Sequence, residues 1–207
     1  MTMQQTPLLM SRIVGRGAQA DPQEEIVTLM AEGTHRQTLK TTWQRANQLA
    51  GALAALGIKP GDRVASFMWN NYRHLELYQA VPSMGAVLHT LNIRLGSTDL
   101  DYIINHAQDK VIFIDEDLLP LLDPLLDKIP SVQKLVICRH GEGGETTFAD
   151  TDDYEDFITG QPMTYNWPDL DENTPMGLCY TSGTTGKPKG VMYTNRSTYL
   201  HTMAQAM

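Results

Sequence analysis

Apolar residues recur at intervals of three and four positions in the first third of the chain, which is the spacing of one face of an α-helix. They are Trp43, Ala46, Leu49, Ala50, Leu53 and Leu56. Thr41 and Gln44 have the spacing of a capping box, which predicts that the helix begins there, and Gly57 is expected to end it. A turn over residues 59–62 then leads into residues 63–69, an apolar run without clean alternation. Such a run indicates a strand that is buried on both faces.

Strand and helix signals alternate from there to residue 139. Apolar runs predict strands over residues 86–95 (including an exit loop), 110–115 and 134–139. Helical patterns cover residues 72–85, ended by Pro82 and Gly85; 98–108, capped by Ser97; and 117–129, where a proline leaves the boundaries open. Strands that alternate with helices predict an α/β fold with a mostly parallel sheet flanked by helices and joined by right-handed crossovers.

The pattern changes after residue 140. Residues 141–173 form a Gly- and Asp-rich insert, with one helix predicted around the segment DDYEDFI. Residues 175–181 then predict a strand that runs directly into a polar loop, and an extended run resumes at residues 191–195. The last helical pattern reaches Met207 without a cap, which favours a fragment cut inside a helix.

Charge is unevenly distributed over the 207 residues, which carry a net charge of −8 and are 42% hydrophobic. Ten acidic residues lie between Gly141 and Gly186, where there is no lysine or arginine. We interpret this run as a solvated surface segment. An acidic chain without a broad basic face argues against binding to nucleic acid.

The two cysteines, Cys138 and Cys179, are far apart in the sequence and lack the spacing of metal ligands. This argues against a disulfide framework or a zinc site and favours a reducing compartment. The N-terminus has no apolar run long enough for a secretory signal, and prolines and aspartates interrupt the leucine-rich run at residues 117–129. We therefore expect a cytoplasmic protein with no transmembrane segment.

The polar loop, YTSGTTGKPKG at residues 180–190, carries the chain's most specific chemistry. Its glycines let backbone N–H groups approach a ligand closely, its threonines and serine supply hydroxyl donors, and Lys187 and Lys189 supply positive charge. A loop that follows a strand lies at the carboxyl edge of the sheet, where α/β folds bind ligands. These features predict an anion site, and a phosphate chain is the expected ligand.

The loop does not match the P-loop pattern G-x-x-x-x-G-K-[ST]. Thr181 stands where that pattern has its first glycine, and Pro188 stands where it has serine or threonine. Pro188 also removes an N–H group that the start of a phosphate-binding helix would use. A Walker-type NTPase is therefore disfavoured, and the order of hydroxyls, glycines and lysines is too specific for an ordinary flexible turn.

The segment YTSGTTGKPKGV resembles the signature of the adenylate-forming enzymes, which include acyl-CoA synthetases, luciferases and the adenylation domains of peptide synthetases. The resemblance covers essentially the whole chain, and the phrase GAVLHTLNIRL is similar to the branch that activates medium- and long-chain fatty acids. It implies that residues 1–207 are a truncated N-terminal portion of the family's large, AMP-binding domain. We accordingly expect an N-terminal subdomain over about residues 1–140, an acidic insert over about 141–173, and a phosphate-binding strand–loop–strand unit over 175–194.

The resemblance also implies a two-step reaction. A carboxylate attacks the α-phosphate of ATP to give an acyl-adenylate and pyrophosphate, and the thiol of coenzyme A then displaces AMP to give a thioester. The phosphate-wrapping residues of the family match Thr181, Ser182, Gly183, Thr184, Thr185 and Gly186. Thr184 is the hydroxyl expected beside Mg²⁺, Lys189 matches the second lysine of the signature, and Lys187 occupies a variable position with a weaker role. No residue of this chain is expected to be catalytic.

The implied partners are a fatty acid or related carboxylic acid, ATP and coenzyme A, and a homodimer stays open. In the family, the acid and adenine pockets and the adenylation lysine come after the signature, so the chain alone is expected to be inactive. Two alternatives remain: a ligase or carrier-loading adenylation domain for another carboxylic acid, and a non-catalytic nucleotide-binding fragment.

Other polar residues are interpreted as structural. His89 and His106 have no second ligand at metal spacing. The acids at residues 115–117 follow a strand and precede a helix, where carboxylates favour the helix N-terminus, so they need not form a metal cluster. Cys179 lies inside the strand before the loop and is expected to be buried and inert.

Overall fold

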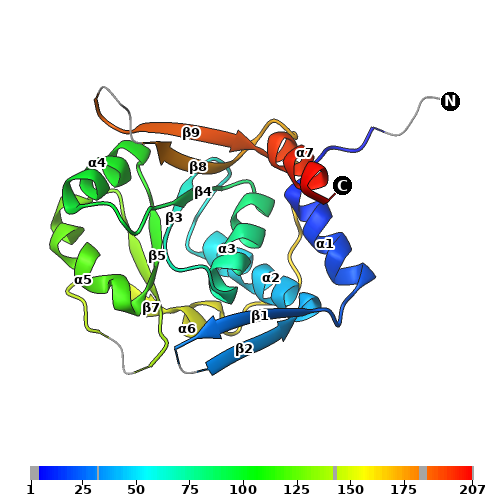
Figure 1. Cartoon of the computed structure of the whole chain (residues 1–207), viewed down its shortest axis with the longest axis horizontal. Helices are drawn as coiled ribbons and strands as arrows, with labels where there is room; N and C mark the ends of the chain where they lie inside the picture. Colours follow the sequence, from blue (N-terminus) through cyan, green and yellow to red (C-terminus); the bar gives the residue numbers. More distant parts are fainter. Residues whose placement is uncertain (1–4, 32, 142–143, 182–185, 207) are drawn as a thin grey trace.

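The computed structural model describes residues 5–31, 33–141, 144–181 and 186–206. Within these residues, the central feature is a seven-stranded sheet in the order β7-β6-β5-β3-β4-β8-β9 (Figure 1). Its strands are β3 (Arg63–Phe67), β4 (Val87–Thr90), β5 (Val111–Asp115), β6 (Lys134–Cys138), β7 (Thr151–Asp153), β8 (Pro175–Thr181) and β9 (Lys189–Thr194). All neighbours are parallel except β8 and β9, which confirms the predicted α/β class with a mostly parallel sheet.

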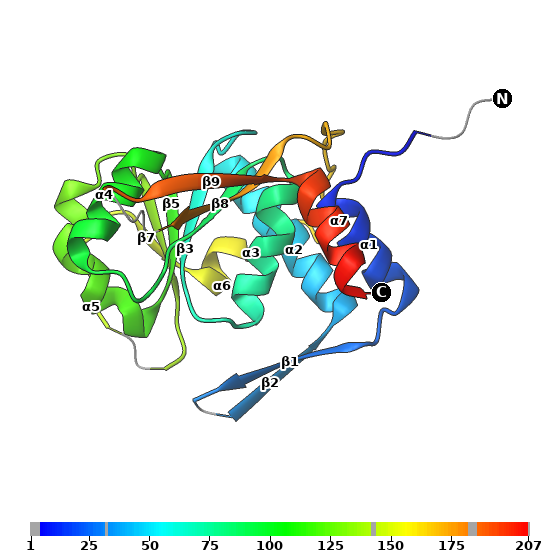
Figure 2. The same ribbon diagram turned by 45° about the horizontal axis from the view of Figure 1, so that its top comes forward.

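Helices cover both faces of this sheet (Figures 1 and 2). One face carries α2 (Leu39–Ala55), α3 (Tyr72–Ser83) and α6 (Tyr154–Ile158). The other carries α4 (Ser97–Ala107), α5 (Leu119–Leu122) and the 3₁₀ turns η1 (Glu116–Leu118) and η2 (Asp123–Lys128). Along β5, Val111 and Phe113 belong to the first core, while Ile112 and Ile114 belong to the second. Because successive side chains enter opposite cores, the strand reads as one continuous apolar run.

The N-terminal part of the chain forms elements that the sequence pattern did not predict. Helix α1 (Met10–Ala20) packs against α2, α3 and the last described helix, α7 (Asn195–Ala206). It is followed by an antiparallel hairpin of β1 (Glu25–Met30) and β2 (Gly33–Thr38), which projects from the body of the molecule in Figure 2. The hairpin is largely exposed, and Leu29 is 85% exposed, so its strands carry no apolar alternation that would mark them.

The start of α2 differs from the predicted capping box. Thr38 caps the helix, and its Oγ1 accepts a hydrogen bond of 3.1 Å from the backbone N–H of Thr41. The prediction that Thr41 and Gln44 form the cap is therefore wrong. Strand β2 ends at Thr38 with extended backbone, which is the conformation that an N-cap residue requires, so the helix begins three residues earlier.

Two other helix ends also differ from prediction. Gly96 holds the cap position of α4, and Ser97 is the first helical residue, without a side-chain capping bond at that end. Pro82 lies in the last turn of α3 instead of ending it, and Gly85 follows the helix with a φ of +90°. The predicted helix over 117–129 is divided into η1, α5 and η2, and Pro120 and Pro124 lie near the starts of α5 and η2, where proline is tolerated.

The acidic segment is bound to the rest of the fold more closely than a solvated run would be. Its strand β7 pairs in parallel with β6. Its ion pairs join Asp150 and Asp152 to Lys134, Asp153 to Arg139, and Glu155 to Arg45 and Arg73. These four acids stay at the surface, with side chains 41–59% exposed, so the interpretation as a surface segment holds, but elements distant in sequence supply their cations.

A buried carboxylate also holds several elements together. Glu76 of α3 is fully buried and accepts hydrogen bonds from Arg45 Nε at 2.7 Å, Gln37 Nε2 at 3.0 Å and the Tyr154 hydroxyl at 2.6 Å. These partners come from α2, β2 and α6.

No helix among the described residues combines the length and apolarity that a membrane crossing requires.

Candidate functional site

The polar loop leaves the sheet at its carboxyl edge. Strand β8 runs parallel to β4, and Thr181 at its end pairs with Lys189 at the start of antiparallel β9. Residues 182–188 therefore connect two hydrogen-bonded strands at the edge where parallel sheets bind their ligands. This confirms the prediction that a strand leads to the carboxyl edge of the sheet just before the polar loop.

The described residues of the predicted site lie on the two ends of this connection. Thr181, Gly186, Lys187 and Lys189 are all exposed. The Thr181 hydroxyl donates to the Lys189 carbonyl at 3.5 Å, which closes the base of the loop. Ser182, Gly183, Thr184 and Thr185 lie outside the described residues. Their predicted contacts with phosphate, and that of Thr184 with Mg²⁺, stay predictions.

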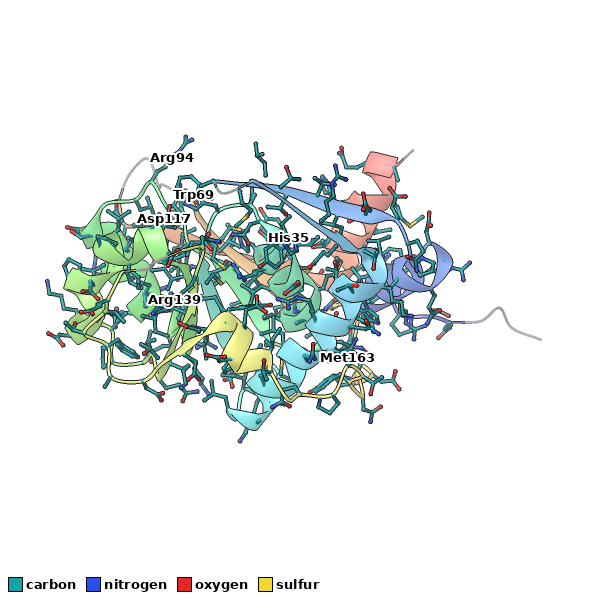
Figure 3. All side chains as sticks on the ribbon, turned by 90° about the horizontal axis from the view of Figure 1, so that it is seen from below. His35, Trp69, Arg94, Asp117, Arg139 and Met163 are labelled. Carbon is teal, nitrogen blue, oxygen red and sulfur yellow. The ribbon has the colours of Figure 1, made fainter. Side chains whose placement is uncertain are left out.

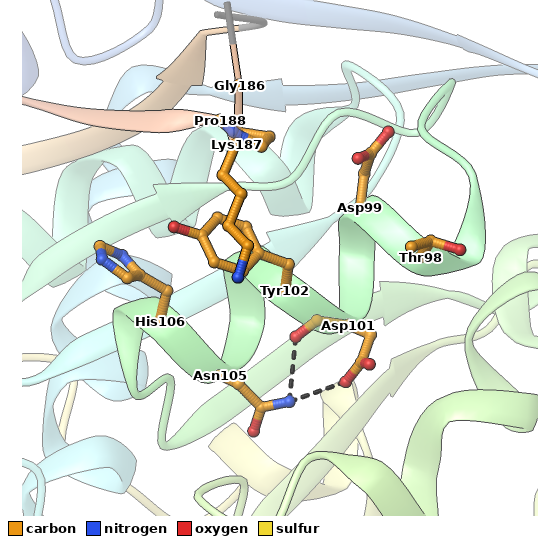
Figure 4. Close-up of a pocket in the computed structure, with 9 residues that line it drawn as sticks. All are labelled: Thr98, Asp99, Asp101, Tyr102, Asn105, His106, Gly186, Lys187 and Pro188. Carbon is orange, nitrogen blue, oxygen red and sulfur yellow. Dashed lines mark hydrogen bonds between the residues drawn. The ribbon is translucent and has the colours of Figure 1, made fainter.

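The C-terminal end of the loop faces helix α4 across an open cleft of about 890 Å³ (Figure 4). Gly186, Lys187 and Pro188 form one wall, and Tyr102 and His106 of α4 lie on the other. Figure 4 shows the Lys187 side chain extended over the Tyr102 ring, with Nζ 4.9 Å from the ring centroid. This is a cation–π contact, so the aromatic face of α4 holds the ammonium group of Lys187.

A second contact between α4 and the strand before the loop involves Tyr180. Its hydroxyl lies 2.6 Å from Nδ1 of His106, and burial raises the pKa of Tyr180 above its usual range. His106 therefore has a structural partner, as expected. Cys179 is only half-buried, with Sγ 3.3 Å from the Thr90 hydroxyl, so the expectation that it is buried is wrong. Its strand lies near the edge of the sheet and is covered less completely than the central strands.

His89 lies beneath Tyr180 in the core. It is fully buried, and its Nδ1 lies 2.7 Å from Oδ2 of Asp109, which is also fully buried. Burial raises the pKa of Asp109, while the hydrogen bond and charge of His89 act in the opposite direction. The His89 ring centroid is 5.2 Å from that of Tyr180, so this pair supports the strand that leads into the loop.

A further polar cluster lies at the carboxyl ends of β3 and β5. Asp115 is buried and accepts hydrogen bonds from the backbone N–H of Trp69 at 2.7 Å and from Asn71 Nδ2 at 3.0 Å, and His140 Nε2 lies 3.0 Å from it. The hydrogen bond to Asp115 raises the pKa of His140. Asp117 accepts from the indole N–H of Trp69 at 2.8 Å, and both side chains are labelled in Figure 3.

The acids at residues 115–117 thus have protein partners. Among the described residues, no group of three or more potential metal ligands occurs.

Sequence reasoning missed the contribution of α4 to the site. Tyr102 and His106 meet the loop from positions more than seventy residues earlier in the chain. No local pattern marks a tyrosine that will face a lysine so distant in sequence. Together, the end of the loop and α4 line an open cleft in which Lys187 supplies a cation and Asp99 and Asp101 of α4 supply carboxylates.

We compared the chain with known proteins to identify its family. The AMP-binding enzyme family matches residues 16–207. The chain is 41% identical to the medium-chain-fatty-acid–CoA ligase of Ectopseudomonas oleovorans, over 99% of this chain and 38% of that protein. It is also 41% identical to the 3-methylmercaptopropionyl-CoA ligase of Ruegeria lacuscaerulensis, over 98% of this chain and 38% of the relative. The chain thus spans less than two-fifths of the length of these relatives.

Comparison of the fold with solved structures also finds CoA ligases. The crystal structure of the anthranilate CoA ligase AuaEII in complex with anthranoyl-AMP matches with a TM-score of 0.81 at 23% identity. The match covers 92% of this chain and 36% of that protein, and at this identity it shows a shared fold. The signature loop, the sheet that carries it and the family match over residues 16–207 agree, and the chain belongs to the AMP-binding enzyme family.

Proposed function

We propose that the complete protein is an ATP-dependent acyl-CoA synthetase for medium- or long-chain fatty acids. In the first step, a carboxylate oxygen attacks the α-phosphorus of ATP, and pyrophosphate leaves. In the second step, the thiol of coenzyme A attacks the acyl carbon, a thioester forms and AMP leaves. The 41% identity to a medium-chain-fatty-acid–CoA ligase supports this reaction class.

The observation that carries the proposal is the strand–loop–strand unit at the carboxyl edge of the sheet. Thr181 and Lys189 close the base of the loop, and the loop sequence places glycines and hydroxyls between them. We assign this unit, residues 175–194, to the β- and γ-phosphates, which leave together as pyrophosphate. Phosphoryl transfer depends on positioning and charge neutralisation, which backbone N–H groups, hydroxyls and lysines supply.

The loop residues have distinct roles in this proposal. Backbone N–H groups of residues 181–186 donate to phosphate oxygens, and the Thr184 hydroxyl contributes one oxygen to the Mg²⁺ that accompanies ATP. Mg²⁺ often keeps several waters and binds mainly through phosphates, so it needs no carboxylate cage in this part of the protein. Lys189 neutralises charge at the loop, and Lys187 has the lesser role.

The remaining parts of the site belong to the rest of the protein. Because this chain spans 38% of its medium-chain relative, we propose that the acid, adenine and coenzyme A sites lie largely outside it. Residues 1–207 alone are then expected to form no acyl-CoA. A cytoplasmic location is part of the same proposal. A homodimer stays open, and analytical ultracentrifugation of the complete protein would settle it.

A substrate panel tests the reaction class. The complete protein is incubated with MgATP, coenzyme A and, in turn, saturated acids from acetate to palmitate and 3-methylmercaptopropionate, and thioester is measured by chromatography. We expect formation to rise steeply from acetate to the medium or long chains. Turnover of 3-methylmercaptopropionate in place of every fatty acid would move the assignment to the other acid class, and no thioester from any acid would reject it.

A further inference from the structure

A broad groove lies between α1, the first turns of α2 and residues 163–167, with a volume of about 880 Å³. It is at the opposite end of the molecule from α4, which Figure 1 shows on the left, with α1 on the right. Tyr199 of α7 and Met163 also line it, and Met163 is labelled in Figure 3. The groove shares no lining residue with the cleft beside the phosphate loop.

Aromatic side chains form the floor of the groove. The rings of Trp43 and Trp167 stack with centroids 5.0 Å apart, and Tyr165 lies 4.8 Å from Trp167. A Cβ atom at Gly15 of α1 would lie 3.5 Å from the Trp43 ring, so the helix rests directly on the indole. The backbone N–H of Tyr165 donates to Asn47 Oδ1 at 2.9 Å, which fixes the segment against α2.

The rim of the groove is cationic. Arg12 and Arg16 are exposed on successive turns of α1, and Lys40 is exposed at the start of α2. None of the three forms an ion pair within the described part of the chain, and no aspartate or glutamate lines the groove. This local excess of positive charge lies on a chain whose net charge is −8.

The indole rings of Trp43 and Trp167 add hydrogen-bond donors to the groove. Trp69 elsewhere in the fold donates its N–H to Asp117 at 2.8 Å. The indole N–H groups of Trp43 and Trp167 have no such acceptor among the residues that the structure describes. Cations, free N–H donors and an aromatic floor are the groups that an anion with an apolar body requires.

We propose that this groove binds a single anionic amphiphile with a carboxylate head and an alkyl chain. The head lies at Arg12, Arg16 and Lys40, and the chain lies on Trp43 and Trp167. The volume is within the range of roughly 300–1,000 Å³ that is usual for small-molecule sites. The charge pattern selects an anion, and the concave shape selects a monomeric amphiphile over a membrane surface. This site is independent of the function proposed for the loop.

Tryptophan fluorescence tests the proposal directly, because two of the three tryptophans lie in the groove. The chain with Trp69→Phe is titrated with sodium dodecanoate below its critical micelle concentration, with dodecyltrimethylammonium and with acetate. We expect a saturable change in fluorescence with dodecanoate and no response to acetate, which lacks the alkyl chain. The cationic amphiphile should bind at least about tenfold more weakly, a difference of about 1.4 kcal/mol in binding free energy.

Variants locate the site. The double change Arg12→Gln and Arg16→Gln is expected to weaken dodecanoate binding by about tenfold or more. Arg36→Gln, which removes an exposed arginine of the hairpin, should leave binding within about twofold. Trp167→Leu should also weaken binding. Circular dichroism melts confirm that each variant is folded.

Three results would overturn the proposal. One is equal binding of the anionic and cationic amphiphiles. Another is undiminished dodecanoate binding in the double arginine variant. The third is sedimentation with phosphatidylglycerol vesicles that depends on Arg12 and Arg16 while dodecanoate does not bind, which would identify a membrane surface as the partner.

Discussion

Lys187 and Lys189 stand on either side of Pro188, yet their surroundings differ. Lys189 begins β9 and is held in the ladder opposite Thr181. Lys187 lies in the cleft, with its ammonium over Tyr102. An exposed cation–π contact of this kind is worth about 0.5–1 kcal/mol, so Lys187 must give up that contact before it can approach a phosphate. The geometry therefore favours Lys189 as the lysine that serves the loop.

Replacement of each lysine separates their roles. In the complete protein, Lys189→Gln is expected to lower kcat/KM for ATP by about 10²-fold, which is typical for loss of a preorganised charge or donor. Lys187→Gln should lower it by less than about tenfold, because its cation is engaged elsewhere. Initial rates of pyrophosphate release at varied ATP provide the measurement. A larger loss for Lys187→Gln would contradict this assignment.

Gly85 shows how one residue fixes a helix-to-strand turn. Its φ is +90°, and a Cβ atom there would lie 3.0 Å from Leu170 Cδ2. We expect Gly85→Ala to lower the free energy of unfolding by about 1–2 kcal/mol, because an L-residue is strained in this region. Gly17→Ala in α1 is the matched control, since nothing lies within 4 Å of its added Cβ and alanine favours a helix. Urea denaturation measures both, and equal effects would show that the turn tolerates a side chain.

Elements differ in how well their sequences reveal them. Strand β5 is evident because both of its faces are buried, which leaves an uninterrupted apolar run. Helix α2 is evident from its apolar period, although its cap is not, because Thr38 and Thr41 are the same residue type at two possible starts. The hairpin β1–β2 escapes notice because its strands bury little, and β7 has only three residues. Periodicity therefore reports burial, and elements held by backbone pairing or ion pairs leave little pattern.

The position of the α2 cap is testable by substitution. Thr38→Ala removes the acceptor for the Thr41 N–H and is expected to cost about 1 kcal/mol in the free energy of unfolding. Thr41→Ala keeps that backbone bond and should cost less. Chemical denaturation of both variants provides the comparison. A greater cost for Thr41→Ala would restore the cap that the sequence suggested.

At the scale of the whole molecule, ion pairs attach the acidic segment to the N-terminal elements. Glu155 bridges Arg45 of α2 at 2.9 Å and Arg73 of α3 at 3.0 Å. Partial burial raises the pKa of Glu155, but the hydrogen bonds and charges of Arg45 and Arg73 outweigh it and hold the pKa below the ordinary 4.5. The stabilisation from a carboxylate with a depressed pKa is present above its unfolded pKa and is lost as pH falls through its folded pKa.

The depressed pKa of Glu155 predicts how the stability of the protein depends on pH. Glu155→Gln is expected to lower the free energy of unfolding at pH 7 by about 1 kcal/mol, since solvent screens a half-exposed pair. The difference from wild type should shrink as pH falls below 4.5. Asp156→Asn, a neighbouring acid without an ion pair among the described residues, should change stability less. A deficit of Glu155→Gln that grows at low pH would contradict the prediction.

Only part of the candidate site could be derived from the sequence. The loop can be recognised in the sequence because its glycines, hydroxyls and lysines are contiguous, and the strand before it indicates its place at the sheet edge. Tyr102 and His106 were not predicted to face it, because their proximity depends on how α4 crosses between β4 and β5. The bonds of Asp115 to Trp69 and His140 likewise join three separate strand ends. Contiguous chemistry can be read from sequence, whereas contacts that the fold assembles need the structure.

Fatty-acid-dependent exchange of labelled pyrophosphate into ATP tests the central claim most directly, because only a reversible adenylation step returns pyrophosphate to ATP. The complete protein is incubated with MgATP, labelled pyrophosphate and dodecanoate, without coenzyme A. We expect rapid exchange that requires the acid and falls by about 10²-fold with Lys189→Gln. ATP hydrolysis without acid, and no exchange with any fatty acid, would contradict the assignment of the loop to an adenylate-forming site.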